Sequence, residues 1–148
     1  MINEGLKTSI PRRAFTAAAF IIALIGLADA AYLTSKHLSG AAVPCNLVSG
    51  CETVLTSQWA EILGLPTALY GALAYFIAFA LAFLAFSGRH RLWNLFGMIS
   101  AVMFLFSIFL VYLQAAVIGA FCQYCLVSAA TSTMLFLIFL ASRFFPKT

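Results

Sequence analysis

The feature that most constrains this chain is a set of four apolar stretches, each long enough to cross a lipid bilayer. They cover about 14–36, 66–87, 92–118 and 122–142. A transmembrane helix needs roughly 20 mainly apolar residues. Hydrophobic residues make up 64% of the chain and charged residues 8%, far outside the range of soluble domains. We therefore predict an all-α integral membrane protein, in which residues 1–148 form one domain around a bundle of four transmembrane helices.

The basic residues are divided unevenly between the segments that flank these stretches. Seven of the eight precede the first stretch, separate the second from the third, or follow the fourth: Lys7, Arg12, Arg13, Arg89, Arg91, Arg143 and Lys147. Segment 37–65 has none, and Lys36 only borders it. Cytoplasmic loops of membrane proteins are enriched in Lys and Arg, so we predict that both termini are cytoplasmic. The net charge of +4 then reflects topology, and we expect no nucleic-acid partner.

All four cysteines fall on the opposite side in this topology. Cys45 and Cys51 lie in segment 37–65, and Cys122 and Cys125 form a CxxC where the last apolar stretch begins. The non-cytoplasmic side is where disulfides form and persist. Their gathering on that side is the most specific feature of the sequence.

Segment 37–65 carries a helix-start signal directly before its second cysteine. Ser49 and Glu52 have the spacing of a capping box, which would place Cys51 in the first helical turn. The helix should carry four apolar residues on one face: Leu55, Trp59, Ile62 and Leu63. We expect a half-buried helix that covers the non-cytoplasmic mouth of the bundle.

The CxxC has the position and spacing of a reactive thiol pair. Residues three apart share one face of a helical turn. The first turn of a helix has unpaired N–H groups and the positive end of the dipole, and both favour thiolate over thiol. A stabilised thiolate is also a good leaving group in exchange. Electrons could therefore pass by exchange between a pair on the loop and a pair at the membrane surface. A lipid-soluble acceptor such as a quinone suits that depth.

Two alternatives compete with a redox role. Both pairs could be static disulfides in a four-helix structural protein, although a CxxC bridge closes too small a ring to restrain the unfolded chain much. Four cysteines could instead bind zinc, although an oxidising compartment suits disulfides better. The redox interpretation therefore stands first, with no metal site expected.

Asp29 is the one acidic residue within an apolar stretch. Ionisable groups in membrane spans are functional candidates, and a proton relay is one interpretation. The other is structural, since Asp29 lies toward the outer end of its stretch and could reach a hydroxyl group or water inside the bundle. The sequence favours the structural interpretation.

Four features along nearly the whole chain match a known family. They are Cys45-x5-Cys51, Ser57-Gln58-Trp59-Ala60, Gly64-Leu65-Pro66 through Gly71, and Cys122-Gln123-Tyr124-Cys125. On these features the chain resembles the vitamin K epoxide reductase family, most closely its bacterial members.

The resemblance implies a four-helix bundle around a quinone of the ubiquinone, menaquinone or vitamin K type. It implies that Cys122 and Cys125 are the active-site pair and that Cys45 and Cys51 relay electrons from a thioredoxin-like partner. The residues expected at the quinone are Ser57, Trp59, Thr67 and Cys125.

The sequence also departs from the family pattern in two respects. Many bacterial members carry a fused thioredoxin-like domain, which is absent here, so the partner should be a separate periplasmic protein. Vertebrate members have an Asn that contacts the quinone where this chain has Thr67, which favours plain quinone reduction over epoxide reduction.

We therefore expect a thiol–disulfide oxidoreductase of the bacterial inner membrane, with its cysteines on the periplasmic side, that supports disulfide formation. The alternatives are an epoxide or quinone reductase in a eukaryotic lumen and a structural protein with static disulfides.

Overall fold

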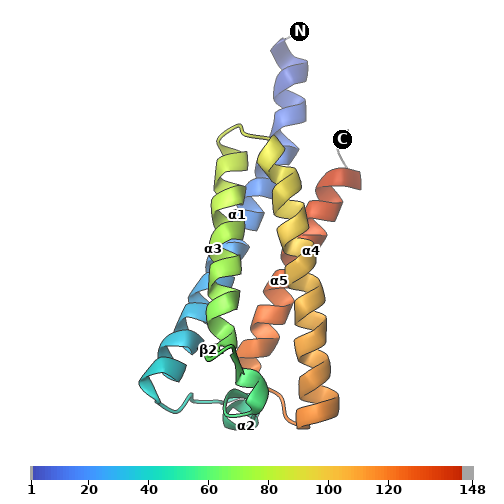
Figure 1. The fold of residues 1–148 in the computed structure, drawn as a ribbon. Helices are drawn as coiled ribbons and strands as arrows, with labels where there is room; N and C mark the ends of the chain where they lie inside the picture. Colours follow the sequence, from blue (N-terminus) through green and yellow to red (C-terminus); the bar gives the residue numbers. More distant parts are fainter. Residues whose placement is uncertain (1, 145–148) are drawn as a thin grey trace.

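The computed structural model describes residues 2–144, with side chains from 13 to 144. Four long helices form the body of the molecule (Figure 1). They are α1 (Ile2–Ser39), α3 (Thr67–Phe86), α4 (Arg91–Tyr112) and α5 (Gln123–Phe144). A π-helical segment, η2 (Leu113–Ile118), continues α4 to its end.

These helices contain four segments long and apolar enough to span a membrane. The segments are Arg13–Ser39, Thr67–Phe86, Arg91–Ile118 and Gln123–Phe144, and their mean hydropathy lies between 2.0 and 2.4. The predicted all-α bundle of four spanning helices is therefore confirmed, with ends that differ from the expected ranges by a few residues.

Small residues line the contacts between the helices. α1 packs against α3 and α5, and α4 packs against the same two helices. Much of the core is Ala, with Tyr75, Phe96 and Leu135 as its largest fully buried side chains. A Cβ at Gly26 would overlap the Tyr75 ring, so this glycine lets α1 and α3 approach closely. Many large apolar side chains point outward instead, which suits a surface in contact with lipid.

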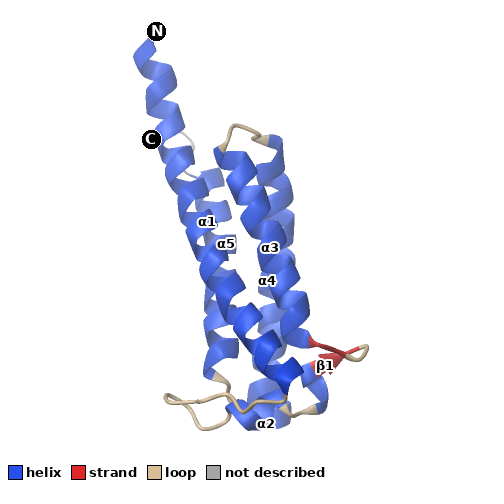
Figure 2. Cartoon of the chain, turned by 90° about the vertical axis from the view of Figure 1, so that its left-hand side faces the viewer, coloured by secondary structure: helices blue, strands red, loops and turns tan. Residues whose placement is uncertain are grey.

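The two ends of the bundle are built differently. Both termini and the short α3–α4 turn lie at one end, and the segment between α1 and α3 lies at the other (Figure 1). The α4–α5 connection also lies at this second end. We call it the cysteine end, because Cys45 and Cys51 lie between α1 and α3, and Cys122 and Cys125 lie where α5 begins. Its segment contains α2 (Cys51–Leu55), the 3-10 turn η1 (Gln58–Ala60) and a hairpin of β1 (Glu61–Ile62) and β2 (Leu65–Pro66) (Figure 2).

The predicted helix begins at Cys51, but the capping box is wrong. Gly50 occupies the cap position, and no side chain caps the helix. Glu52 Oε1 instead accepts a hydrogen bond from the Val43 N–H group at 2.8 Å. The carboxylate thus ties the start of the loop to α2.

The predicted helix is also much shorter than expected. α2 ends at Leu55, and the backbone is extended at Ser57, with a ψ of 162°. The next two hydroxyl groups bond to backbone carbonyls of the helix. Thr56 Oγ1 donates to Glu52 O at 2.5 Å, and Ser57 Oγ donates to Val54 O at 2.7 Å. The placement of Trp59, Ile62 and Leu63 on one helical face is therefore wrong. Trp59 lies in η1, Ile62 in β1 and Leu63 at the hairpin tip.

The hairpin follows from backbone conformation at its tip. Leu63 and Gly64 have φ values of 56° and 80°, which give a two-residue turn between paired strands. Two hydroxyl groups of α3 hold this region in place. Thr67 Oγ1 donates to Trp59 O at 2.8 Å, and the Tyr70 hydroxyl donates to Ile62 O at 3.0 Å. α2, η1 and the hairpin together form the roof of the cysteine end.

Candidate functional site

The loop cysteines form a disulfide and differ in exposure. Cys45 and Cys51 are bonded, with their Cα atoms 6.0 Å apart. Cys51 is fully buried at the start of α2, whereas Cys45 is half-buried in irregular chain. A thiol from outside the bundle therefore has better access to Cys45.

The CxxC cysteines are free thiols at the start of α5. Cys122 is fully buried and directly precedes the helix, and its carbonyl accepts the first helical bond, from Leu126 N–H at 3.0 Å. Cys125 is half-buried one turn later. The structure thus places the pair at the N-terminus of α5, where the helix favours a thiolate.

Gln114 shapes the turn that leads into the CxxC, and the sequence did not single it out for this role. Its carbonyl oxygen accepts bonds from Gly119 and Ala120, at 2.9 and 3.1 Å. Its side-chain Oε1 accepts a bond from Cys122 N–H at 3.0 Å. One buried residue therefore satisfies three N–H groups of this turn. An amide side chain near the end of a long apolar stretch was the available signal.

The electrostatic surroundings of Cys122 favour its ionised form. A hydrogen bond from the Cys125 thiol lowers the pKa of Cys122 to about 7, against the opposing effect of burial. Backbone N–H groups of the α5 turn lower the pKa further, and the Asp29 carboxylate raises it. Near neutral pH, Cys122 is therefore ready to act as a nucleophile or as a leaving group.

The two pairs meet in one buried cluster. Cys51, Val54 and Cys122 form its core, and Cys45 and Cys125 pack against them. The loop, α2 and the start of α5 each contribute residues to this cluster. The inner cysteine of each pair, Cys51 and Cys122, is fully buried there.

Close backbone contact makes this meeting possible. A Cβ at Gly50 would lie 2.6 Å from Phe121 O and 2.8 Å from Phe121 N. Such distances leave no room for a side chain, so only glycine lets the start of α2 rest on the turn before α5. The residue that precedes Cys51 thus lies against the residue that precedes Cys122.

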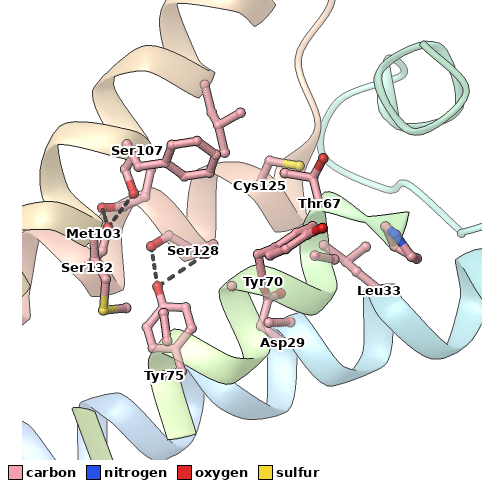
Figure 3. A pocket seen from close by; sticks show the side chains of 18 of the residues that line it. Asp29, Leu33, Thr67, Tyr70, Tyr75, Met103, Ser107, Cys125, Ser128 and Ser132 are labelled. Carbon is pink, nitrogen blue, oxygen red and sulfur yellow. Dashed lines mark hydrogen bonds between the residues drawn. The ribbon is translucent and has the colours of Figure 1, made fainter. Parts of the chain in front are cut away.

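A cavity of about 220 Å³ opens beneath this cluster, between the four helices and the roof. Cys125 lines it, together with apolar side chains such as Leu33, Met103 and Leu110 (Figure 3). Of the residues expected at a quinone, Trp59 and Thr67 also line it. Ser57 does not. It lines a neighbouring, more polar pocket of about 390 Å³ under the roof.

Most hydroxyl groups around the cavity are already bonded to each other. The Tyr75 hydroxyl lies 2.6 Å from Thr131 Oγ1 and 2.5 Å from Ser128 O. Ser107 and Ser132 are joined at 2.6 Å (Figure 3). These bonds hold α3, α4 and α5 together around the cavity.

Asp29 is the exception. Among the residues with described side chains, its Oδ2 is the one buried side-chain polar atom without a hydrogen-bond partner. The structure therefore does not support the expectation that a hydroxyl group of the bundle satisfies this oxygen. Asp29 lines the cavity and points into it from α1 (Figure 3). Leaving a buried polar group unpaired is costly, which makes this carboxylate a candidate for a role in the cavity.

The side chains that could bind a metal do not form a metal centre within the described part of the chain. No group of three or more His, Cys, Asp or Glu residues is placed there to hold an ion. The chemistry available is that of two thiol pairs beside a largely apolar cavity.

Comparisons with known proteins identify the family of this chain. The model of the vitamin K epoxide reductase family matches residues 17–140. Thiol-disulfide oxidoreductase LTO1 from Arabidopsis thaliana is 32% identical over 119 residues, which cover 74% of this chain and 32% of the relative. The chain thus spans about a third of that relative's length. With a match over four spanning helices and all four cysteines, the chain belongs to the vitamin K epoxide reductase family.

Proposed function

We propose that the protein is a membrane thiol–disulfide oxidoreductase that supports disulfide formation. Electrons pass from a reduced thioredoxin-like partner through Cys45 and Cys51 to Cys122 and Cys125, and then to a quinone. The observation that carries the proposal is the buried cluster in which the two pairs meet at the edge of a cavity. The LTO1 relative, a thiol-disulfide oxidoreductase by name, supports the same class of reaction.

The first step is exchange with the partner, and exposure favours Cys45 as its target. A partner thiolate attacks Cys45 Sγ, and Cys51 leaves as a thiolate. The second thiol of the partner then displaces Cys45. The partner leaves oxidised, and the loop pair holds two thiols.

The second step is exchange between the pairs. The Cys51 thiolate attacks Cys122 of a Cys122–Cys125 disulfide, and Cys125 leaves as a thiolate. Cys45 then attacks Cys51, which restores the loop disulfide and frees Cys122 as a thiolate. One disulfide replaces another at each attack. The end state has an oxidised loop and a reduced CxxC, as in the structure described here.

The cavity fits a quinone by its lining and by its unpaired polar atom. Its walls are mostly apolar, as in typical sites for small lipid-soluble ligands, and a few polar groups converge in it. Trp59, Thr67 and Cys125 are the residues that would hold the quinone, and Ser57 lines the neighbouring pocket. A bound quinone would accept the two electrons and two protons that the CxxC gives up on closing its disulfide.

Asp29 can hold a proton in this process. Its carboxylate shares the cavity with Cys125, and Oδ2 has no competing hydrogen bond. A carboxylate in that position can accept the proton of the Cys125 thiol and keep it inside the cavity, away from bulk water.

Thr67 supports plain quinone reduction over epoxide reduction. Its hydroxyl group already donates to the carbonyl of Trp59, so it is committed to holding the roof. Thr67 therefore lines the cavity without a free donor, and it does not supply the N–H group of the Asn that the vertebrate members have there.

For location, we propose the bacterial inner membrane, with both termini in the cytoplasm and the cysteine end in the periplasm. The four cysteines gather in one cluster, around the starts of α2 and α5. This cluster lies at the end of the bundle away from the α3–α4 turn (Figure 1), which supports this orientation. In intact cells, the single-cysteine variant that keeps the half-buried Cys45 should react with a membrane-impermeant maleimide after reduction. Protection of all four positions, with labelling only after lysis, would contradict it.

Thiol trapping tests the function itself. Cells are quenched with acid and alkylated with a mass-tagged maleimide, with and without the quinone pool. Withdrawal of quinone should leave Cys122 and Cys125 reduced, and loss of the partner should leave both pairs oxidised. Cysteines that keep one state under both conditions would indicate static disulfides.

A further inference from the structure

The two residues inside the CxxC hold the chain on both sides of Cys45. Gln123 Oε1 accepts hydrogen bonds from the backbone N–H groups of Asn46, at 3.1 Å, and Leu47, at 2.8 Å. The Tyr124 hydroxyl donates to the carbonyl oxygen of Pro44 at 3.0 Å. We call this set of three bonds the Cys45 clamp.

The clamp depends on the chemistry of these two side chains. Both partners of Gln123 are N–H donors, so the bond needs an oxygen acceptor of the right length at this position. The Tyr124 ring packs beside the Tyr32 ring of α1, with centroids 5.4 Å apart, which fixes the direction of its hydroxyl group. Both residues lie in the first turn of α5. The clamp is therefore attached to the same turn that carries Cys122 and Cys125.

We propose that Gln123 and Tyr124 are positioning residues that keep Cys45 within reach of Cys51 while Cys51 is bonded to Cys122. The inference rests on the relay proposed above. In the step concerned, the Cys45 thiolate attacks Sγ of Cys51 in the Cys51–Cys122 bridge. The Cys45–Cys51 disulfide forms, Cys122 leaves as a thiolate, and no outside oxidant or reductant is needed.

Cys45 needs such a restraint because its segment has little other structure. Residues 41–50 form no helix or strand, and most of their side chains are exposed. Apart from the clamp, the bond between Val43 N–H and Glu52 ties this segment to α2. Once the loop disulfide opens, Cys45 could move away from Cys51. A restraint raises the effective concentration of a reacting group without touching the reacting atoms.

The experiment isolates this step from the partner and the quinone by using Cys125→Ser as the parent. In that protein Cys122 can attack Cys51, and within the site only Cys45 can undo the bridge. The measured quantity is the ratio of Cys51–Cys122 to Cys45–Cys51 in purified protein, by acid quench and non-reducing peptide mapping. The pH is chosen so that less than half of the parent is bridged.

Gln123→Met in this parent keeps the side-chain length and removes the acceptor. The ratio should rise about three- to tenfold, since two hydrogen bonds of ordinary net strength are lost. Gln123→Glu in the same parent should give a ratio near the parental value, because a carboxylate oxygen can accept both N–H groups. Tyr124→Phe should raise the ratio less, since it removes one bond and keeps the ring. The matched control is Gln58→Met, the same change at an exposed position in η1, which should have no effect.

The outcomes distinguish the clamp from the relay on which it rests. An unchanged ratio in Gln123→Met, or an equal rise in Gln58→Met, would overturn the clamp and leave the relay standing. A ratio that rises as much in Gln123→Glu as in Gln123→Met would also overturn it, because the hydrogen-bond acceptor would then not determine the ratio. Absence of any bridge to Cys122 in the parent itself would overturn the relay, and the clamp with it.

Discussion

The two cysteine pairs are built on different supports but share one asymmetry. The loop pair joins irregular chain at Cys45 to the short helix α2 at Cys51, and the side chains of Glu52 and Gln123 hold this irregular chain by hydrogen bonds. The CxxC instead begins a long helix. In each pair one cysteine is fully buried, Cys51 in one and Cys122 in the other. The remaining member of each pair faces elsewhere. Cys45 is half-buried in the loop, and Cys125 lines the cavity.

In the proposed relay, this difference sets the direction of electron transfer. The half-buried Cys45 would exchange with the partner protein, the two inner cysteines would exchange with each other, and Cys125 would pass electrons to a ligand in the cavity. A static disulfide would need none of these distinctions. The predictions below disturb one side of the comparison at a time, in order of decreasing expected effect.

The largest effect should come from Cys125→Ser, which removes the cysteine that faces the cavity. Quinone reduction should stop, because Cys122 has no partner with which to form a disulfide. A bridge from Cys45 or Cys51 to Cys122 should accumulate in protein purified from cells that contain the partner, and peptide mapping would detect it. Normal quinone reduction, with a free Cys122 and an intact Cys45–Cys51 disulfide, would contradict both the relay and the role of Cys125.

Asp29→Asn removes the unpaired carboxylate from the cavity and leaves all cysteines in place. Quinone reduction should slow by about a hundredfold, the usual scale for loss of a general acid or base. Exchange between the loop pair and the CxxC, followed by thiol trapping without quinone, should continue at its normal rate. Asp29→Glu, which keeps a carboxylate, is the control. An Asn variant as fast as the wild type would rule out the proton role.

Gly50→Ala should separate the two inner cysteines. The added methyl group would lie against the Phe121 backbone, so the start of α2 must move away from the turn before α5. Overpacking of this kind costs about 1–3 kcal/mol, and exchange between the pairs should slow by about tenfold. Oxidation of a reduced CxxC by added quinone should be unaffected. Ser49→Ala, at the exposed neighbouring position, controls for a general change in the loop, and an equal loss there would remove the special role of Gly50.

The prediction for pH concerns the inner cysteine of the helix pair. Because the pKa of Cys122 is about 7, its thiolate fraction falls as the pH drops below 7. Single-turnover oxidation of the reduced CxxC should therefore slow by about fivefold between pH 7 and pH 6, and level off above pH 8. A cysteine with an ordinary pKa of about 8.5 would keep gaining rate to higher pH. A profile still rising steeply at pH 9 would contradict the assignment.

The smallest effect should come from Ser57→Ala. Ser57 is expected near the quinone on family resemblance, yet it lines the neighbouring, more polar pocket and donates to Val54 O. We expect a two- to threefold slower rate at limiting quinone, on the order of one lost hydrogen bond, with both disulfides still able to form. Thr67→Val is the comparison inside the cavity. An unchanged rate for Ser57→Ala would leave Trp59 of the roof and Thr67 of α3 as the residues to pursue.

The sequence predicted those parts of the molecule that follow from local motifs or from the average hydropathy of long stretches. Length and hydropathy predicted the four spanning helices. The grouping of the cysteines followed from placing Cys45, Cys51, Cys122 and Cys125 in that topology. Both inferences are insensitive to the exact position of a single side chain.

The detailed structure of the cysteine end could not be predicted from such patterns. The helix after Cys51 was predicted too long, because the backbone is extended at Ser57 and Leu63 takes a positive φ. The role of Gln114 depends on how its π-helical segment ends. The contacts of Gln123 join positions 76 and 77 residues apart, which no local pattern records.

The most direct test of the relay follows both disulfides in the same wild-type molecules without quinone. Protein with an oxidised CxxC is treated under anaerobic conditions with one equivalent of reduced partner, then quenched with acid at intervals and mapped by mass spectrometry. The relay predicts that the loop disulfide opens first. It then re-forms as the Cys122–Cys125 disulfide disappears, with the number of thiols unchanged in that second phase. A loop pair that stays reduced beside an intact Cys122–Cys125 disulfide would contradict electron transfer between the pairs.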